Sequence, residues 1–283
     1  NIFFGINFSV VQYITHGKIH PFGLNVIRVG VSVLLLWVIW LFVVQKAGIH
    51  RRDIGRFILC AITGVVINQS LFIKGLSMTL SIHAALLILV TPIFITIVAA
   101  WVGTEAMTVW KTVGLLAGIS GAAILALDKQ HAGTAQDVLL GDIFIIINAI
   151  SYAIYFALVK PLMSNYNPVH VIRWIFTIGF VMMLPIGWSE FREISWSGFS
   201  AIDYTALAFI VLGATFFAYL FNLYGINHLG SGITGTYIYT QPFFASLIAV
   251  WFLGEVFTRN KIVAAILIAS GVLLVSLKSR NKK

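Results

Sequence analysis

The sequence predicts an all-α membrane protein with ten transmembrane helices, arranged as two inverted five-helix repeats. Three observations predict this class: the apolar composition, the division of the chain into ten apolar runs, and an internal repeat with a spacing of 150 residues. Of the 283 residues, 60% are hydrophobic and only 10% are charged, whereas a soluble domain has about 25% charged residues. Because so few charges cannot cover a surface in water, we expect most of the surface to face lipid.

Ten apolar runs lie between the charges, and most are close to the ~20 residues that a helix needs to cross a hydrocarbon core. Long unbroken runs indicate helices, because a β-barrel would show alternating segments of about ten residues. The first run is short, and the chain begins on Asn1 rather than Met, so we expect the start of the first helix to be missing. The runs cover residues 1–14, 23–44, 54–73, 80–102, 109–127, 139–159, 169–188, 204–224, 233–253 and 262–277.

The repeat is clearest in two stretches, "VTPIFITIVAAWVGTE" (90–105) and "TQPFFASLIAVWFLGE" (240–255). A shift of 150 residues pairs residues 75–127 with the second half without a gap. The paired residues include Pro92 with Pro242, Trp101 with Trp251, Glu105 with Glu255, and Lys111 with Lys261. Two unrelated apolar segments would match leucine with isoleucine, not these residue types in register, so the repeat indicates duplication.

The predicted domains are a first repeat over residues 1–127, a polar linker over 128–137, a second repeat over 138–277 and a basic cytoplasmic tail over 278–283. Each repeat holds five spans, and an odd number makes the second repeat enter the membrane from the opposite side. Inverted repeats of this kind characterise many secondary transporters, whose substrate lies near the midplane between the halves.

Loop charges predict that both termini are cytoplasmic. With that orientation the inner loops and tail carry ten Lys and Arg residues and the outer loops carry six, in agreement with the positive-inside rule. The net charge of +9 reflects this bias. Nucleic-acid binding is not implied, because no basic patch forms a domain of its own.

Pro92 and Pro242 fall inside apolar runs, where each removes a backbone hydrogen bond and frees the carbonyl four residues earlier. One interpretation is a packing kink, which is common in membrane helices; the other is a bend that shapes a cavity or acts as a hinge. Glu105 and Glu255 end their helices, and we expect them to cap the next helix or to pair with Lys111 and Lys261, rather than to couple transport to protons.

The chain resembles the EamA family of the drug/metabolite transporter superfamily over essentially its whole length. The resemblance rests on the ten helices, the two repeats and the proline–tryptophan–glutamate ending of the fourth and ninth helices. "GDIFIIINAISYAIYFALVKPL" (141–162) is similar to the family's opening of the second repeat, and "GSGITGTYIYTQPFFASLIAVWFLGE" (230–255) to its ninth helix. The resemblance implies export or exchange of small metabolites such as amino acids, or of drugs, and it does not identify the substrate. It implies no cofactor, and a bacterial inner membrane as the location.

Polar side chains within the spans are the candidates for substrate contact, since a polar group facing lipid is costly. Residues 148, 152 and 155 share one helix face by their i, i+4, i+7 spacing, and residues 237 and 241 are likewise four apart. The alternative for each is hydrogen bonding between helices. The candidates are Asn7, Asn68, Gln69, His83, Asn148, Tyr152, Tyr155, Asn222, Tyr237 and Gln241.

Charged and titratable residues within the spans are few. His83 could change charge near neutral pH, or be a structural histidine. Arg28 and Arg173 lie about five residues inside their spans, within snorkelling reach of lipid head groups, although either could bind an anion. No carboxylate lies deep in a span, which favours facilitated diffusion or histidine-based coupling over a carboxylate-coupled carrier.

The leading hypothesis is a carrier that moves small molecules by alternating access, as an exporter or facilitator. A flippase for a lipid or lipid-linked sugar is the alternative, and a channel or scaffold is a third. An intramembrane enzyme is disfavoured, because the sequence holds no zinc-protease or nucleophile-elbow motif. The predicted partners are a small-molecule substrate and the lipid bilayer; we expect no metal and a possible monomer.

Overall fold

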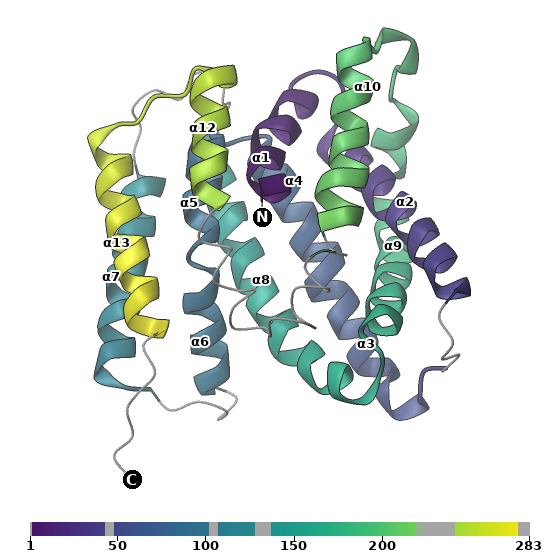
Figure 1. Ribbon diagram of the computed structural model, residues 1–283, viewed down its shortest axis with the longest axis horizontal. Coiled ribbons are helices and arrows are strands. Elements are labelled where there is room, and N and C mark those ends of the chain that lie inside the picture. Colours follow the sequence, from purple (N-terminus) through teal and green to yellow (C-terminus); the bar gives the residue numbers. More distant parts are fainter. Residues whose placement is uncertain are drawn as a thin grey trace.

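The computed structural model describes residues 2–42, 48–101, 107–127, 137–218, 221 and 241–276. Within these ranges the helices join into ten rods that follow the ten predicted runs in order (Figure 1). The helices of the first half are α1 (Ile2–Thr15), α2 (Pro21–Leu41), η1 (Arg51–Asp53), α3 (Ile54–Ala61), η2 (Ile62–Ile67), α4 (Asn68–Leu76), α5 (Ser81–Ile88), α6 (Thr91–Trp101) and α7 (Val109–Ala126). Those of the second half are α8 (Val138–Asn165), α9 (Pro168–Arg192), η3 (Trp196–Gly198), α10 (Ala201–Ala208), η4 (Phe209–Phe217), α12 (Gln241–Leu253) and α13 (Arg259–Ser276).

Length and composition suit these rods to a membrane. Five are long and apolar enough to cross one: Pro21–Leu41, Arg51–Leu76, Ser81–Val98, Val138–Met163 and Pro168–Arg192. Shorter apolar helices include α1, α12 and the rod formed by α10 and η4. Large apolar side chains such as Leu34, Phe243 and Trp251 stand on the outer surface. Exposed apolar surface of this extent indicates contact with the lipid of a membrane.

The contact between α7 and α13 relates the two halves by a twofold axis. A Cβ added to Gly121 would lie 2.9 Å from the carbonyl oxygen of Ala264, and one added to Gly271 would lie 2.5 Å from that of Gly114. A shift of 150 residues converts one contact into the other, and the numbering shows that the two helices run antiparallel. Because the two helices are antiparallel and each contact is the symmetry copy of the other, the twofold axis runs perpendicular to the helices. The second half is therefore inverted relative to the first.

The starts of these two helices repeat the same capping bond. The hydroxyl of Thr108 accepts a hydrogen bond from the backbone N–H of Lys111 at 3.3 Å, and that of Thr258 accepts one from Lys261 at 3.2 Å. A threonine at this position satisfies an N–H group that the helix itself leaves unpaired. The local sequence therefore fixes the same helix start in each repeat.

The third rod of each half contains a π-helical segment, η2 in the first and η4 in the second. A π segment disturbs the regular backbone ladder, and side chains meet the affected carbonyls here: the Ser151 hydroxyl donates to the Thr63 carbonyl at 2.7 Å, and the Thr215 hydroxyl donates to Ile210 at 2.8 Å. Segments of this kind occur often at functional sites. The two halves therefore correspond in backbone conformation as well as in sequence.

The fourth rod breaks between α5 and α6, directly before Pro92. This is the interruption expected from a proline that lacks a backbone N–H group. Pro242 is the second residue of α12, and residues 222–240 lie outside the described part of the chain. Whether either proline acts as a hinge stays a prediction.

The two halves interlock rather than standing side by side. From the first half, α1 packs against α12 and η4, and α2 packs against α9. From the second half, α8 packs against α4, α5 and α6. The helices α1, α4, α5 and α8 thus meet in the interior of the bundle (Figure 1). The buried polar side chains on these helices, such as Asn7, Asn68, His83 and Asn148, are therefore enclosed by both repeats.

Candidate functional site

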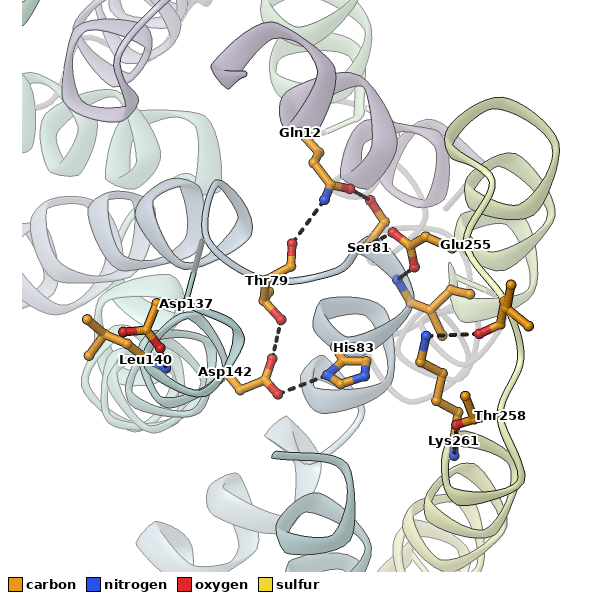
Figure 2. A network of polar contacts seen from close by, with 12 residues as sticks. Gln12, Thr79, Ser81, His83, Asp137, Leu140, Asp142, Glu255, Thr258 and Lys261 are labelled. Carbon is orange, nitrogen blue, oxygen red and sulfur yellow. Dashed lines mark hydrogen bonds and ion pairs between the residues drawn. The ribbon is translucent and has the colours of Figure 1, made fainter. Parts of the chain in front are cut away.

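A buried histidine–carboxylate pair joins the two repeats at the start of α5 and α8. His83 Nδ1 lies 2.9 Å from Asp142 Oδ2, and neither side chain has any exposed surface. The other oxygen of Asp142 accepts a hydrogen bond from the Thr79 hydroxyl, in the turn between α4 and α5 (Figure 2). Both oxygens of this carboxylate are therefore occupied by groups of the opposite repeat.

Gln12 extends the pair into a network that reaches α1. Its side-chain N–H donates to the Thr79 carbonyl at 3.0 Å, and its side-chain oxygen accepts from the Ser81 hydroxyl (Figure 2). Gln12 is 6% exposed, so its amide group is removed from solvent. Buried networks of this kind are stable only when their members are satisfied.

Glu255 closes the network from the segment between α12 and α13. Its two carboxylate oxygens accept the backbone N–H groups of Ser81 at 2.7 Å and Ile82 at 3.0 Å (Figure 2). The carboxylate therefore caps α5, where the helix dipole favours negative charge. Burial raises the pKa of Glu255, and the two N–H bonds oppose that rise.

The expectation for Glu255 thus needs one correction. It does cap a helix, but that helix belongs to the other repeat and is not the next one along the chain. Lys261 is fully buried beside it, with its ammonium donating to the Val256 carbonyl at 2.9 Å. Glu105, the partner of Glu255 in the repeat, lies outside the described residues.

Asn68 and Asn148 bring α4 and α8 together through reciprocal hydrogen bonds. The Asn148 amide donates to the Asn68 carbonyl at 2.7 Å, and the Asn68 amide donates to the Asn148 carbonyl at 3.4 Å. Both residues are buried. The two residues therefore form hydrogen bonds between helices, which was the alternative to substrate contact. Substrate contact by either residue stays a prediction.

Tyr152 and Tyr155 lie one and two turns beyond Asn148 on α8, as the spacing predicted. Their rings are 5.7 Å apart, and both side chains are half-buried. Tyr155 packs against η2, where a Cβ added to Gly64 would lie 2.5 Å from its ring. This face of α8 therefore borders the π segment of the third rod.

The remaining candidates lie on α1 and α12. The side-chain oxygen of Asn7 is buried and has no hydrogen-bond partner within the described residues. Gln241 begins α12 and is buried, and its carbonyl borders Gly5 of α1. Tyr237 and Asn222 lie outside the described residues.

Several buried polar atoms in this interior have no partner in the described part of the chain. They belong to helices of the first repeat that pack against one another, α1 with α4 and α5, and α2 with α4. Each such atom is unfavourable unless a water or a bound molecule satisfies it. The atoms are Asn7 Oδ1, Ser9 Oγ, Asn25 Oδ1, Ser70 Oγ and His83 Nε2.

The structure buries both arginines within the protein instead of extending them to the head groups. Arg28 donates to the Thr215 hydroxyl of η4 at 2.8 Å. The Arg173 guanidinium lies 4.4 Å from the ring centre of Trp37 and 4.1 Å from that of Trp40, and it contacts His170 at 3.0 Å. Neighbouring rods therefore supply the partners, so snorkelling is unnecessary.

Sequence reasoning missed Asp142, Gln12 and Thr79. Asp142 is the fourth residue of the apolar run 139–159 and is completely buried. The expectation that no carboxylate lies deep in a span therefore needs correction, because a position near the end of the run did not reveal this burial. An acidic residue within such a run was nevertheless a usable signal, since it requires a partner inside the membrane. Gln12 and Thr79 gave no comparable signal.

Inverted five-helix repeats with polar groups buried between them are the architecture of a multi-pass membrane transporter. The chain belongs to the EamA-like transporter family, whose model matches residues 1–127 and 139–277.

Individual relatives agree with this assignment. The chain is 22% identical to the uncharacterized transporter YyaM of Bacillus subtilis over 280 residues, covering 98% of this chain and 90% of that protein. It is 25% identical to a probable terminal-alkyne amino-acid exporter of Streptantibioticus cattleyicolor, covering 92% of this chain and 86% of that protein. A crystal structure superposes with a TM-score of 0.61 at 15% identity, covering 98% of this chain and 94% of its own, which supports the fold alone.

Proposed function

We propose that the protein carries small organic solutes with neutral or zwitterionic polar groups, such as amino acids, across the cell membrane by alternating access. The observation that carries the proposal is the set of unpartnered polar atoms buried between packed helices, above all Asn7 Oδ1. The donors and acceptors of a polar solute would satisfy such atoms. Asn68, Asn148, Tyr152, Tyr155, Tyr237 and Gln241 are the further contacts we propose, with Pro92 and Pro242 as hinges.

Two features support this class of solute. The amide and phenol groups of the proposed contacts suit neutral and zwitterionic ligands, whereas a phosphate would require several converging basic groups. The name of the Streptantibioticus relative also describes an amino-acid exporter. The direction we propose is export or facilitated diffusion.

Counterflow in proteoliposomes tests the proposal. Vesicles loaded with the twenty proteinogenic L-amino acids are diluted into a trace of the same mixture carrying radiolabel. Accumulation of label above that in protein-free vesicles is expected. If counterflow is absent and fluorescent phospholipid analogues move between leaflets, the protein is a flippase and the carrier proposal is wrong.

The orientation is tested separately. We propose the bacterial inner membrane with both termini in the cytoplasm, on the ten-to-six charge count of the loops. Cysteines introduced at Gln45 and Gln136 should react with a membrane-impermeant maleimide from opposite sides of sealed cells. Reaction from the same side would contradict the proposed orientation.

A further inference from the structure

We propose that His83 and Asp142 bind the proton that couples solute movement to a transmembrane proton gradient. This inference rests on the proposed carrier function and assigns His83 to a proton in place of the solute. It follows from the geometry of the pair, from the charges around it, and from its position between the repeats.

The geometry leaves one ring nitrogen available. Asp142 accepts a hydrogen bond at His83 Nδ1, which places the proton of the neutral imidazole on that nitrogen and leaves a lone pair on Nε2. Nε2 is buried and has no hydrogen-bond partner within the described residues. Histidine is the side chain that ordinarily binds and releases a proton within the physiological pH range. Nε2 is the atom at which that proton would bind here.

The surrounding charges favour that proton. The charged groups around His83 are Asp142 of α8, Glu255 of the α12–α13 segment and Lys261 of α13. Among the other helices packed against α5, α1 carries Tyr13, α4 carries Lys74 and α7 carries Lys111. Both oxygens of Glu255 accept N–H bonds, as in an ionised carboxylate.

With His83 neutral, the three described charges of this cluster, on Asp142, Glu255 and Lys261, sum to one negative charge. One proton on Nε2 brings the sum for the cluster to zero. An uncompensated charge is costly in a medium of low dielectric constant, so the cluster is electrostatically suited to a single proton.

The pair also stands where a proton can act on conformation. His83 belongs to the first repeat and Asp142 to the second, and alternating access moves one repeat against the other. Protonation of His83 adds a positive charge opposite the Asp142 carboxylate, and opposite charges attract strongly in a medium of low dielectric constant. Protonation of Nε2 from one side of the membrane would therefore favour the arrangement seen here, and release of the same proton to the other side would weaken it. No bond between heavy atoms changes.

Counterflow and gradient-driven transport separate the proton from the solute. The labelled mixture of twenty L-amino acids is followed in vesicles containing wild type, His83→Asn, Asp142→Asn or His20→Asn, first at equal pH and then with a pH gradient. His20 is exposed at the start of α2 and serves as the matched histidine control. We expect the gradient to drive the wild type and His20→Asn, and to have no effect on His83→Asn or Asp142→Asn, whose counterflow falls by less than tenfold.

Other outcomes overturn the assignment or separate it from the carrier proposal. Gradient-driven transport that persists in His83→Asn, or wild-type counterflow that a gradient does not affect, rejects the proton site and leaves the carrier intact. Loss of counterflow in both folded variants assigns the pair to the solute instead. Failure of the wild type in counterflow counts against the carrier.

A measurement without solute tests the proton site whatever the result of the transport assays. Proton binding is followed by nuclear magnetic resonance on protein with nitrogen-labelled histidine, where the His83 signal is the one missing from His83→Asn. That signal should change from the neutral to the protonated form when the pH is lowered. A signal that does not titrate would reject the site.

Discussion

Glu255 accepts a 2.7 Å hydrogen bond from the backbone N–H of Ser81, a residue 174 positions earlier in the chain and in the opposite repeat. The bond fastens the start of α5 to the segment that follows α12. It is a structural bond between repeats, placed directly beside the His83–Asp142 pair.

Glu255→Gln should lower the stability of the folded protein. Glutamine offers one oxygen where glutamate offers two, so one of the N–H groups of Ser81 and Ile82 loses its partner. The loss of a helix cap costs about 0.5–2 kcal/mol. Thermal unfolding in detergent measures it, and a variant of wild-type stability that has lost gradient-driven transport would make Glu255 a coupling residue instead.

Gly271→Ala should destabilise the contact between α7 and α13. The new methyl group would lie 2.5 Å from the Gly114 carbonyl oxygen, which is backbone and cannot turn aside. Overpacking of this kind costs about 1–3 kcal/mol. Gly55→Ala is the matched control, since nothing lies within 4 Å of that position. Equal melting temperatures for the two variants would contradict the twofold contact.

Arg173→Ala should reduce the yield of folded protein more than transport per folded molecule. The guanidinium lies against Trp37 and Trp40, and a desolvated cation–π contact contributes about 2 kcal/mol. Arg173→Lys keeps the charge but loses the planar stacking, so we expect an intermediate yield. Size-exclusion profiles of fluorescent fusions measure folded yield. A folded alanine variant without transport would indicate an anion site.

We expect the stability that Tyr166 contributes to the folded protein to be lost at alkaline pH. Burial is the largest cause that raises the pKa of this phenol. The hydrogen bond to Asp53 at 2.6 Å raises the same pKa further. A raised pKa means that the stability it contributes is complete below the ordinary value of about 10 and is lost as pH rises through the folded-state value. Tyr166→Phe should therefore be less stable than wild type at pH 7, and the difference should shrink above pH ~10. A constant difference would contradict this account.

The sequence was sufficient for the order of the rods and for their inversion, because both follow from patterns spread over many residues. The 150-residue shift predicted which helices correspond, and the contacts of Gly114 and Gly271 display that correspondence. The two π segments were not predictable, since they arise from backbone hydrogen bonds and leave no regular pattern of side chains.

The candidate site was predicted less completely. Spacing alone could place Asn148, Tyr152 and Tyr155 on one face of α8, because helix geometry is local. The pairing of His83 with Asp142 spans 59 residues and two repeats, and it depends on how α5 docks on α8. Information about such docking lies in tertiary packing, which single-residue patterns do not contain.

The most direct test of the account is transport per folded molecule for variants of the proposed solute contacts. Asn7→Ala, Asn148→Ala and Gln241→Ala are compared with Leu34→Ala, whose side chain is exposed on the outer surface. Counterflow of the labelled amino-acid mixture, divided by the amount of monodisperse protein in the vesicles, should fall at least about fivefold for the three polar variants, the equivalent of one lost hydrogen bond of about 1 kcal/mol. Leu34→Ala should match the wild type. Polar variants as active per folded molecule as Leu34→Ala would contradict a solute path between the repeats.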